Sequence, residues 1–423
     1  MKLIGTRRKS KHSGTEKSNI NDTSNKSKNR KVKASRKKKI IISIVVILAT
    51  LLFILASLFA IVRWEIQPFL DWFFPLPGDG QLGTFRTPYV PENPVDPNNP
   101  IIPRTPDPRY HDEDGEPLPL DKIRNMNIYT FMCFGIDEDG NTDVIMVGAF
   151  NTEDYTINIV SIPRDTMMNS PWETRYYEKK ANFIQPRMRR DNPNTTEGYA
   201  QAMEDALDHF EQIFGFNIDF WFTVNMRGFV ALVDSIGGVT FNVPFTFDWT
   251  DSSDNTFTVT AGNQRLSGRE ALAVLRQRYN PSGASLGDPW RIGNQQRFLK
   301  SAATQILSSG NIDIPKLAGI FINNARTDIQ LDNLIRLGRE FVKVDGSNIN
   351  FETLPGEFIF RYEYMAINVE EWLDIINSKL NPFNFDIEVT DVSILTIDED
   401  RNLYVTDGNF QGSPDWLPNN WRP

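Results

Sequence analysis

Three continuous apolar runs of strand length follow one another within a short stretch of the chain. Residues 128–136 read IYTFMCFGI, residues 144–150 read VIMVGAF and residues 156–162 read TINIVSI. Runs without regular polar alternation are typical of strands buried on both faces, so helices should cover the sheet that they form. The segment NTEDY between the second and third runs is short enough for a hairpin or a bulged turn.

Helical and strand patterns then alternate as far as residue 380. Apolar spacing and capping signals predict helices at residues 198–214, 229–236, 271–278, 291–307, 314–323, 332–342 and 370–380. Further strands are predicted at residues 218–224, 239–243 and 349–354. This mixture predicts an α/β fold, a three-layer α/β/α sandwich around a mixed sheet, within residues 125–380. Residues 381–423 form a C-terminal extension that is compatible with one or two strands.

One segment before this fold has the length and composition of a transmembrane helix. Residues 40–62 are 23 consecutive residues without a charge, and about 20 apolar residues suffice for a helix to cross the hydrocarbon core. Three lysines precede the segment and Arg63 and Trp64 follow it. The positive-inside rule therefore predicts a single-pass signal-anchor with a cytoplasmic N-terminus and an extracytoplasmic domain in the cell membrane. A cleaved signal peptide is the alternative, but the apolar run and the segment before it are too long for one.

The segments on either side of the predicted span differ sharply in composition. Residues 1–39 carry fifteen Lys or Arg and two acidic residues, whereas the whole chain has a net charge of −9. This basic head is predicted to be disordered and to contact anionic membrane lipid. It lacks a helix-turn-helix pattern, so nucleic-acid binding is not expected. Residues 63–124 are rich in Pro, Asp and Asn and are predicted to be a semi-rigid extracytoplasmic linker.

The cysteine and histidine content argues against nucleophilic or zinc chemistry. Cys133 is the only cysteine and sits in an apolar run, which is typical of a small core residue. His12, His111 and His209 are scattered along the chain. A histidine-based triad or a zinc site is therefore not expected.

Four charged residues sit at the ends of the three apolar runs. Asp137 directly follows the first run, Asp143 directly precedes the second, and Arg164 and Asp165 follow the third. Strand ends of this kind can converge at one edge of a sheet, where ligands of open α/β folds commonly bind. Two carboxylates there are a reasonable seat for Mg²⁺, which takes few protein ligands together with phosphate oxygens and waters. The alternative is that these aspartates are ordinary solvated turn residues.

A second group of charged residues occurs later, in LRQRYN and GDPWRIGNQQRFL. Arg276 and Arg278 lie at the predicted end of a helix, where they could simply favour the helix dipole. Asp288 is predicted to cap the next helix, with Arg291 and Gln295 sharing one face. Because planar guanidinium groups match phosphate oxygens, these residues together with Arg164 could line a pyrophosphate site. Surface salt bridges are the alternative.

In order and spacing, these segments resemble the LytR-CpsA-Psr family. The matching pieces are FGIDEDGNTDVIMV, VSIPRDT, FTVNMRGFVALVDSIGGVTFNVP, AGNQRLSGREALAVLRQRYN and GDPWRIGNQQRFL, and they cover roughly residues 127–354. The resemblance implies a membrane-anchored enzyme of the bacterial envelope. Such a phosphotransferase would move a glycopolymer, for example teichoic acid or capsule, from a polyprenyl-pyrophosphate carrier to peptidoglycan through a phosphodiester.

The resemblance also implies roles for individual residues. Asp137 and Asp143 would ligate Mg²⁺, which would make the enzyme magnesium-dependent. Asp288 would orient the neighbouring arginines, and Asp165 would support Arg164, so that Arg164, Asp165 and Asp288 form the catalytic group. The pyrophosphate would be surrounded by a set of cationic and amide side chains, namely Arg164, Arg276, Arg278, Arg291 and Gln295.

Two positions depart from the family pattern. Asn141 stands where the family often has an arginine before the metal aspartate, and Asn294 stands where it often has a basic residue. Fewer positive charges should weaken pyrophosphate binding or change its geometry. Two alternatives to transfer therefore remain open: hydrolysis of the polyprenyl-pyrophosphate-linked polymer, and a non-catalytic scaffold or regulator that binds it.

Overall fold

The computed structural model describes residues 108–172, 178–251, 254–309, 313–359 and 364–411. These residues belong to one compact unit, Pro77–Pro423. The predicted basic head, the predicted membrane span and most of the predicted linker lie outside them. Among the described residues, no helix combines the length and the apolar character that a membrane span requires.

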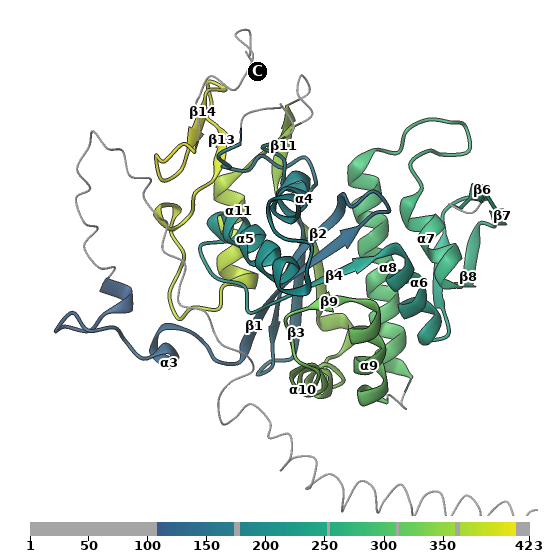
Figure 1. Cartoon of the computed structure of the whole chain (residues 1–423), viewed down its shortest axis with the longest axis horizontal. Helices are drawn as coiled ribbons and strands as arrows, with labels where there is room; N and C mark the ends of the chain where they lie inside the picture. Colours follow the sequence, from purple (N-terminus) through teal and green to yellow (C-terminus); the bar gives the residue numbers. More distant parts are fainter. Residues whose placement is uncertain (1–107, 173–177, 252–253, 310–312, 360–363, 412–423) are drawn as a thin grey trace, which may run out of the picture. The chain divides into compact units, whose positions relative to one another are not determined.

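A six-stranded mixed sheet forms the centre of the unit (Figure 1). Its strand order is β10-β3-β2-β1-β4-β9. Strands β1, β2 and β3 run antiparallel in sequence, β4 and β10 are parallel to their neighbours β1 and β3, and β9 is antiparallel to β4. The strands span Ile128–Ile136 (β1), Thr142–Asn151 (β2), Thr156–Ser161 (β3), Phe220–Asn225 (β4), Arg326–Thr327 (β9) and Ile349–Thr353 (β10). The predicted mixed α/β architecture is thereby confirmed.

The sheet is buried on both faces, as its apolar runs predict. Met132 and Phe134 have no exposed surface and point to one side, where the Phe134 ring lies 5.6 Å from that of Phe210. Phe131 points to the other side and stacks on Phe222 at 5.9 Å. A Cβ at Gly148, the cross-strand neighbour of Phe131, would lie 2.3 Å from the Phe131 ring. Only glycine therefore leaves room for that ring.

Helices α4, α5 and α11 share the largest hydrophobic cluster with one face of the sheet. They span Ala181–Asp191 (α4), Thr196–Phe214 (α5) and Val369–Ile375 (α11), the last continuing through a π-helical turn, Ile376–Leu380 (η4). Thr195 caps α5 by accepting a hydrogen bond from the Gly198 amide, and Gly215 ends it with a φ of 74°. Trp372 of α11 is fully buried and donates its indole N–H to the Ile213 carbonyl. The cap and this bond fix the helical layer.

The opposite face of the sheet packs against α8 and α10. Ala303 and Leu307 of α8 and Leu337 and Phe341 of α10 contact the cluster around Phe131. A separate hydrophobic cluster joins α6 and α7 to two small antiparallel two-stranded sheets, β5–β8 and β6–β7. These elements span Met226–Ser235 (α6), Val239–Val243 (β5), Phe247–Thr250 (β6), Thr256–Val259 (β7), Gly262–Leu266 (β8), Gly268–Arg276 (α7), Gly287–Ser308 (α8), Ile314–Asn324 (α9) and Leu331–Phe341 (α10).

Several local predictions differ from the structure. Helix α4 was not predicted, because its sequence ANFIQPRMRRD carries Pro186 and a run of charges that mask the apolar face. A capping box of Ser267 and Glu270 begins α7, but the helix ends at Arg276 and not at residue 278 as predicted, which leaves Arg278 in the following loop. The prediction that Asp288 caps α8 is wrong: Leu286 is the cap residue and Asp288 lies in the first turn.

The C-terminal segment packs into the domain. Val392 and Ile394 are fully buried members of the largest cluster. Asn169 donates to the Ser393 hydroxyl and to the Asn409 carbonyl, at 2.9 and 2.8 Å. Two hairpins, β11–β12 and β13–β14, lie next to each other there and span Gly356–Ile359, Tyr364–Ile367, Leu395–Ile397 and Leu403–Val405. The segment after residue 380 therefore shares the hydrophobic core.

This packing predicts the effect of shortening a C-terminal side chain. Ile394→Ala should lower the free energy of unfolding by about 2–5 kcal/mol, because the substitution leaves a cavity in a closely packed core. Val389→Ala, at a position that is 44% exposed, should change it by less than about 0.5 kcal/mol. Urea denaturation of the purified full chain measures both. Equal, small effects would mean that the segment is not part of the cooperative fold.

Candidate functional site

Two aspartates near the β1–β2 connection are positioned by different local structures, Asp137 by a turn and Asp143 by a β-bulge. Asp137 follows β1, and its Oδ1 accepts hydrogen bonds from the backbone amides of Asp139 and Asn141, at 3.0 and 2.7 Å. Asp143 is the extra residue of a β-bulge, because Gly135 pairs with Val144 whereas Ile136 pairs with Thr142. A bulge re-aims the side chain of its unpaired residue. Asp143 is thus turned out of the regular ladder, with its side chain 23% exposed.

Arg164 and Asp165 lie three and four residues beyond the end of β3, in a loop that makes hydrogen bonds to two other elements. The Arg164 carbonyl accepts from the Asn182 amide at the start of α4, and the Asp165 carbonyl accepts from the Met365 amide of β12. Pro163 and Thr166 close a tight turn with a 3.0 Å backbone hydrogen bond. The arginine is therefore presented at the sheet edge by a rigid loop.

Arg164 contacts three carboxylates from three parts of the chain. Its Nη1 lies 3.5 Å from Asp143 Oδ1, and its Nε lies 3.6 Å from Asp165 Oδ2 and 4.0 Å from Asp288 Oδ1. The pKa of Arg164 is raised above its usual value: burial acts to lower it, but the charges of Asp165, Asp288 and Asp143 outweigh the burial. The guanidinium therefore remains charged at any physiological pH.

Two further arginines join the same carboxylates. Arg291, 9% exposed, forms an ion pair with Asp288 one turn earlier in α8, and Arg278 Nη2 lies 3.7 Å from Asp143 Oδ2. Burial lowers the pKa of Arg291, and the neighbouring positive charges of Arg164 and Arg278 act in the same direction, whereas Asp288 and Asp143 oppose them. We call this set, Asp143, Arg164, Asp165, Arg278, Asp288 and Arg291, the charged cluster.

Gln295 and Arg276 are the two residues of the predicted pyrophosphate site that do not belong to the charged cluster. Gln295 is buried on α8, one turn beyond Arg291. The Arg276 guanidinium lies over the Trp249 ring, 5.9 Å from its centroid. Among the described residues, no ion pair joins Arg276 to the carboxylates of the charged cluster. The geometry thus brings Arg164, Arg278 and Arg291 together and leaves Arg276 on an aromatic neighbour.

Two residues that position the charged cluster were missed in the sequence. Lys180, with its side chain 6% exposed, donates from Nζ to Asp165 Oδ1 at 2.9 Å. Gln296 donates from Nε2 to Ser161 Oγ at 3.0 Å and to the Glu352 carbonyl at 2.6 Å, which ties α8 to the ends of β3 and β10. Lys180 precedes a helix without an apolar signature, and Gln296 is one of two adjacent glutamines. Neither carries a local signal that would set it apart.

The two asparagines that depart from the family pattern have defined structural roles. Asn141 is exposed and closes the Asp137 turn, with its Nδ2 3.1 Å from Asp137 Oδ2. Asn294 is 1% exposed and donates to the Val274 carbonyl at 3.2 Å, which links α8 to α7. Its amide therefore contributes to helix packing.

Asp137 and Asp143, the two predicted magnesium ligands, lie on either side of the β1–β2 turn: Asp137 follows β1 and Asp143 is the second residue of β2. They are carboxylates at neighbouring strand ends, and each oxygen that accepts one hydrogen bond keeps a further lone pair. In the described residues, no group of three or more His, Cys, Asp or Glu side chains has a metal-binding arrangement. An ion held here would accordingly take few protein ligands, which is the usual situation for Mg²⁺ bound together with phosphate oxygens.

Neither Cys133 nor His209 is suited to acid–base or nucleophilic chemistry. Burial raises the pKa of the Cys133 thiol to about 12. Burial also lowers the pKa of His209 to about 4, against the opposing effect of Asp205, and the imidazole packs on Trp172 at 4.9 Å. At neutral pH the thiol is therefore protonated and the imidazole uncharged.

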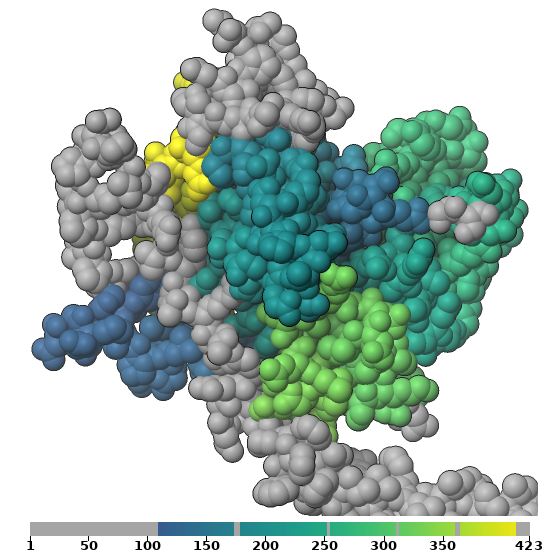
Figure 2. Space-filling model, viewed as in Figure 1, coloured from purple at the N-terminus to yellow at the C-terminus, as the bar shows by residue number. Residues whose placement is uncertain are grey.

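A large polar pocket adjoins the charged cluster. It has a volume of about 1240 Å³, and Asp137, Arg164, Asp165 and Lys180 contribute to its lining. The other walls include residues of the β1–β2 turn, α4, α5, the end of β4, the start of α6 and residues 323–326. Figure 2 shows the blue, teal and light-green surfaces of these regions next to one another. The cluster thus opens onto a space large enough for an extended ligand.

Several characterised proteins are similar to this chain. The cell wall biosynthesis protein LcpA of Corynebacterium glutamicum is 27% identical over 234 residues, which are 52% of this chain and 44% of LcpA. The teichoic acid transferase TagV of Bacillus subtilis is 24% identical over 241 residues, which are 55% of this chain and 58% of TagV. The chain thus spans about half the length of these relatives.

Solved structures and a family model complete the comparison. The crystal structure of B. subtilis TagV matches with a TM-score of 0.48 and 21% identity, covering 60% of this chain and 96% of that one. A structure of TagT bound to LIIa-WTA matches with a TM-score of 0.45 and 17% identity, covering 61% and 92%. The LytR_cpsA_psr family model matches residues 110–379, well over half of the sequence. The chain therefore belongs to the LytR_cpsA_psr family.

Proposed function

We propose that this protein transfers a glycopolymer from a polyprenyl-pyrophosphate carrier to peptidoglycan and joins them through a phosphodiester. The observation that carries the proposal is the meeting of Arg164, Arg278 and Arg291 around Asp143 and Asp288 at one edge of the sheet. The names of the relatives support it, since TagU of Enterococcus faecalis, 23% identical over 227 residues, is a polyisoprenyl-teichoic acid–peptidoglycan teichoic acid transferase.

The charged cluster has the properties that a diphosphate requires. A diphosphate carries several negative charges in a small volume, and guanidinium groups donate parallel hydrogen bonds to phosphate oxygens. Arg164 Nε is a buried donor without a hydrogen-bond partner among the described residues. Asp288 and Asp165 hold the arginines in place, so that phosphate oxygens can compete for donors that are already oriented. Gln295 and Arg276 are proposed to act at the periphery of this site.

Asp137 and Asp143 would hold a magnesium ion beside the diphosphate. A bound Mg²⁺ would neutralise part of the charge on the phosphate oxygens. The turn around Asp137 and the bulge at Asp143 fix the two carboxylates independently of substrate. The chain's own part is therefore to present both carboxylates at the edge of the sheet that also carries Arg164.

The proposed reaction is a displacement at the phosphorus nearer the polymer. A sugar hydroxyl of peptidoglycan forms the new P–O bond and loses its proton, while the bridging P–O bond breaks and polyprenyl phosphate leaves. Arg164 and Arg291 stabilise the charge that develops on the phosphoryl and leaving-group oxygens. Asp137 and Asp143 are the candidates for accepting the hydroxyl proton. No covalent bond to the protein is needed, which agrees with the protonated Cys133.

Residues 40–62 are proposed to anchor the domain in the cell membrane as a single pass, with the N-terminus in the cytoplasm. This arrangement would place the domain outside the cell, next to both the polyprenyl carrier and peptidoglycan. The predicted linker would set its distance from the lipid surface. The polyprenyl chain itself would remain in the outer leaflet.

Transfer can be measured directly. The full chain, a synthetic polyprenyl-pyrophosphate donor, a peptidoglycan oligomer and Mg²⁺ should give a covalent product. Arg164→Ala and Asp143→Ala should each lower the rate at least about a hundredfold, because each removes a charge positioned for the transition state. Arg269→Gln is a matched control, since Arg269 pairs with Asp251 outside the charged cluster.

The alternatives give different results in the same assay. Release of free phosphorylated polymer without acceptor would identify a hydrolase. Tight donor binding without product, with or without Mg²⁺, would identify a non-catalytic scaffold. Either result would contradict transfer, whereas mass-spectrometric detection of the linked product would support it.

A second prediction concerns the anion that the arginines attract. Asp288→Asn removes the partner of the buried Arg291 and should lower the free energy of unfolding by about 3 kcal/mol. Inorganic pyrophosphate should then raise the thermal midpoint of Asp288→Asn more than that of the wild type, because it replaces the missing negative charge. Asp191→Asn, which affects an exposed pair with Arg187, should behave like the wild type. An identical response of all three proteins to pyrophosphate would contradict the anion site.

A further inference from the structure

Four arginines line the part of the pocket that the charged cluster does not occupy. Arg189 and Arg190 come from α4, Arg227 from the start of α6, and Arg326 from β9. All four are exposed, and we call them the arginine wall. They come from three elements that are far apart in sequence, so their meeting is a property of the fold and not of a local run of charge.

Aromatic rings hold three of these arginines in position. The guanidinium groups of Arg189 and Arg326 lie over the same ring, 5.0 and 4.3 Å from the centroid of Tyr199. Arg190 lies over Phe183 at 5.1 Å. The Tyr199 hydroxyl is itself fixed by a 2.8 Å hydrogen bond with Thr223 Oγ1. Cation–π contacts of this kind orient a guanidinium while leaving its N–H donors available.

The arginine wall lacks the acidic partners that other arginines in this chain have. Within the described ranges, no ion pair to Asp or Glu involves any of its four members. Elsewhere, carboxylates pair with Arg109, Arg124, Arg187, Arg269 and Arg401. Two guanidinium groups that share one ring repel each other, and that repulsion is relieved when an anion lies between them.

The charge of the residues that line the pocket also favours an anionic ligand. Six Lys or Arg and four Asp or Glu line it, in a chain with a net charge of −9. The acidic residues belong to the β1–β2 turn, apart from Asp165, which Lys180 neutralises. The α4, α6 and β9 side is therefore strongly positive. A concave surface of one sign concentrates ligands of the opposite sign.

We propose that the arginine wall binds phosphate groups carried along the glycopolymer, beyond the diphosphate that links it to the lipid. This inference rests on the proposed function, because it takes the charged cluster as the diphosphate site. Arg164 and Asp165 line the same pocket as the arginine wall, so a polymer attached at the charged cluster can extend along it. The protein would thus favour a polymer that is itself an anion, such as a polyol phosphate, over a neutral glycan.

The test measures binding of soluble oligomers to the full chain. A fluorescently labelled oligo(glycerol phosphate) should bind the wild type at least about tenfold more tightly than a neutral dextran oligomer of similar length. The double variant Arg189→Gln/Arg326→Gln should lose roughly tenfold in affinity for the charged oligomer, as expected for the loss of charge-assisted hydrogen bonds. Its affinity for the neutral oligomer should not change.

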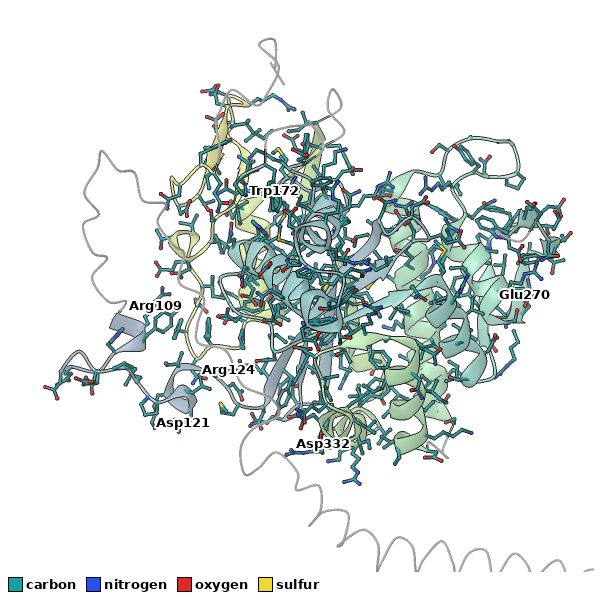
Figure 3. All side chains as sticks on the ribbon, viewed as in Figure 1. Arg109, Asp121, Arg124, Trp172, Glu270 and Asp332 are labelled. Carbon is teal, nitrogen blue, oxygen red and sulfur yellow. The ribbon has the colours of Figure 1, made fainter. Side chains whose placement is uncertain are left out.

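Arg187→Gln is the matched control, because Arg187 lies on the same helix but contacts Asp191 and the ring of Trp172, which Figure 3 labels. This control should bind the charged oligomer like the wild type. Equal binding by the wild type and the double variant would overturn the proposal. If inorganic phosphate bound as tightly as the oligomer, the wall would be a simple phosphate site and the polymer proposal would fail.

Failure of this inference can be told apart from failure of the proposed function. The same variants are assayed with a polyprenyl-pyrophosphate donor that carries a neutral sugar. The double variant should transfer it at the wild-type rate, since the charged cluster is intact. If the wild type binds the charged and the neutral oligomer equally while transfer is normal, only the inference about the wall is refuted. Selective binding of the charged oligomer without transfer of any donor supports the wall and refutes the transferase.

Discussion

The site depends on the balance of opposite charges around Arg164. Three carboxylates, from the β2 bulge, from the loop after β3 and from the first turn of α8, contact the guanidinium of Arg164, whose side chain is half-buried. An arginine in this position would be costly without those partners, and the partners would repel one another without the arginine. Arg164 therefore links the three segments to one another, and it also lines the pocket.

The sheet provides the geometry that this balance requires. The bulge between β1 and β2 turns Asp143 out of the ladder, and the antiparallel pairing of β2 with β3 places the loop of Arg164 at the same edge of the sheet. Gln296 ties α8 to the ends of β3 and β10, so the helix that carries Asp288 and Arg291 cannot shift independently. Lys180 completes the arrangement by donating a hydrogen bond to Asp165 Oδ1. Rigid elements thus supply most of the positioning, which suits a reaction that relies on electrostatic preorganisation.

Features that depend on local sequence were predictable, and features that depend on tertiary contacts were not. The apolar runs predicted β1, β2 and β3 and their burial on both faces, because periodicity and length decide such strands. The charged strand ends indicated where Asp143, Arg164 and Asp165 lie. Helix α4 escaped prediction because Pro186 and three arginines obscure its apolar face, and with it Lys180 and half of the arginine wall were missed. The contact of Arg276 with Trp249 was also unpredictable, since β6 carries no signal that it reaches the end of α7.

The most direct measurement of the central claim compares two lipids that differ by one phosphate. Polyprenyl pyrophosphate and polyprenyl monophosphate are titrated into the full chain and into Arg164→Ala, each with Mg²⁺ present. A charged cluster built to hold a diphosphate predicts that the wild type binds the pyrophosphate lipid at least about tenfold more tightly, and that Arg164→Ala loses this preference. Equal affinity of the wild type for both lipids, or an unchanged preference in the variant, would contradict the account.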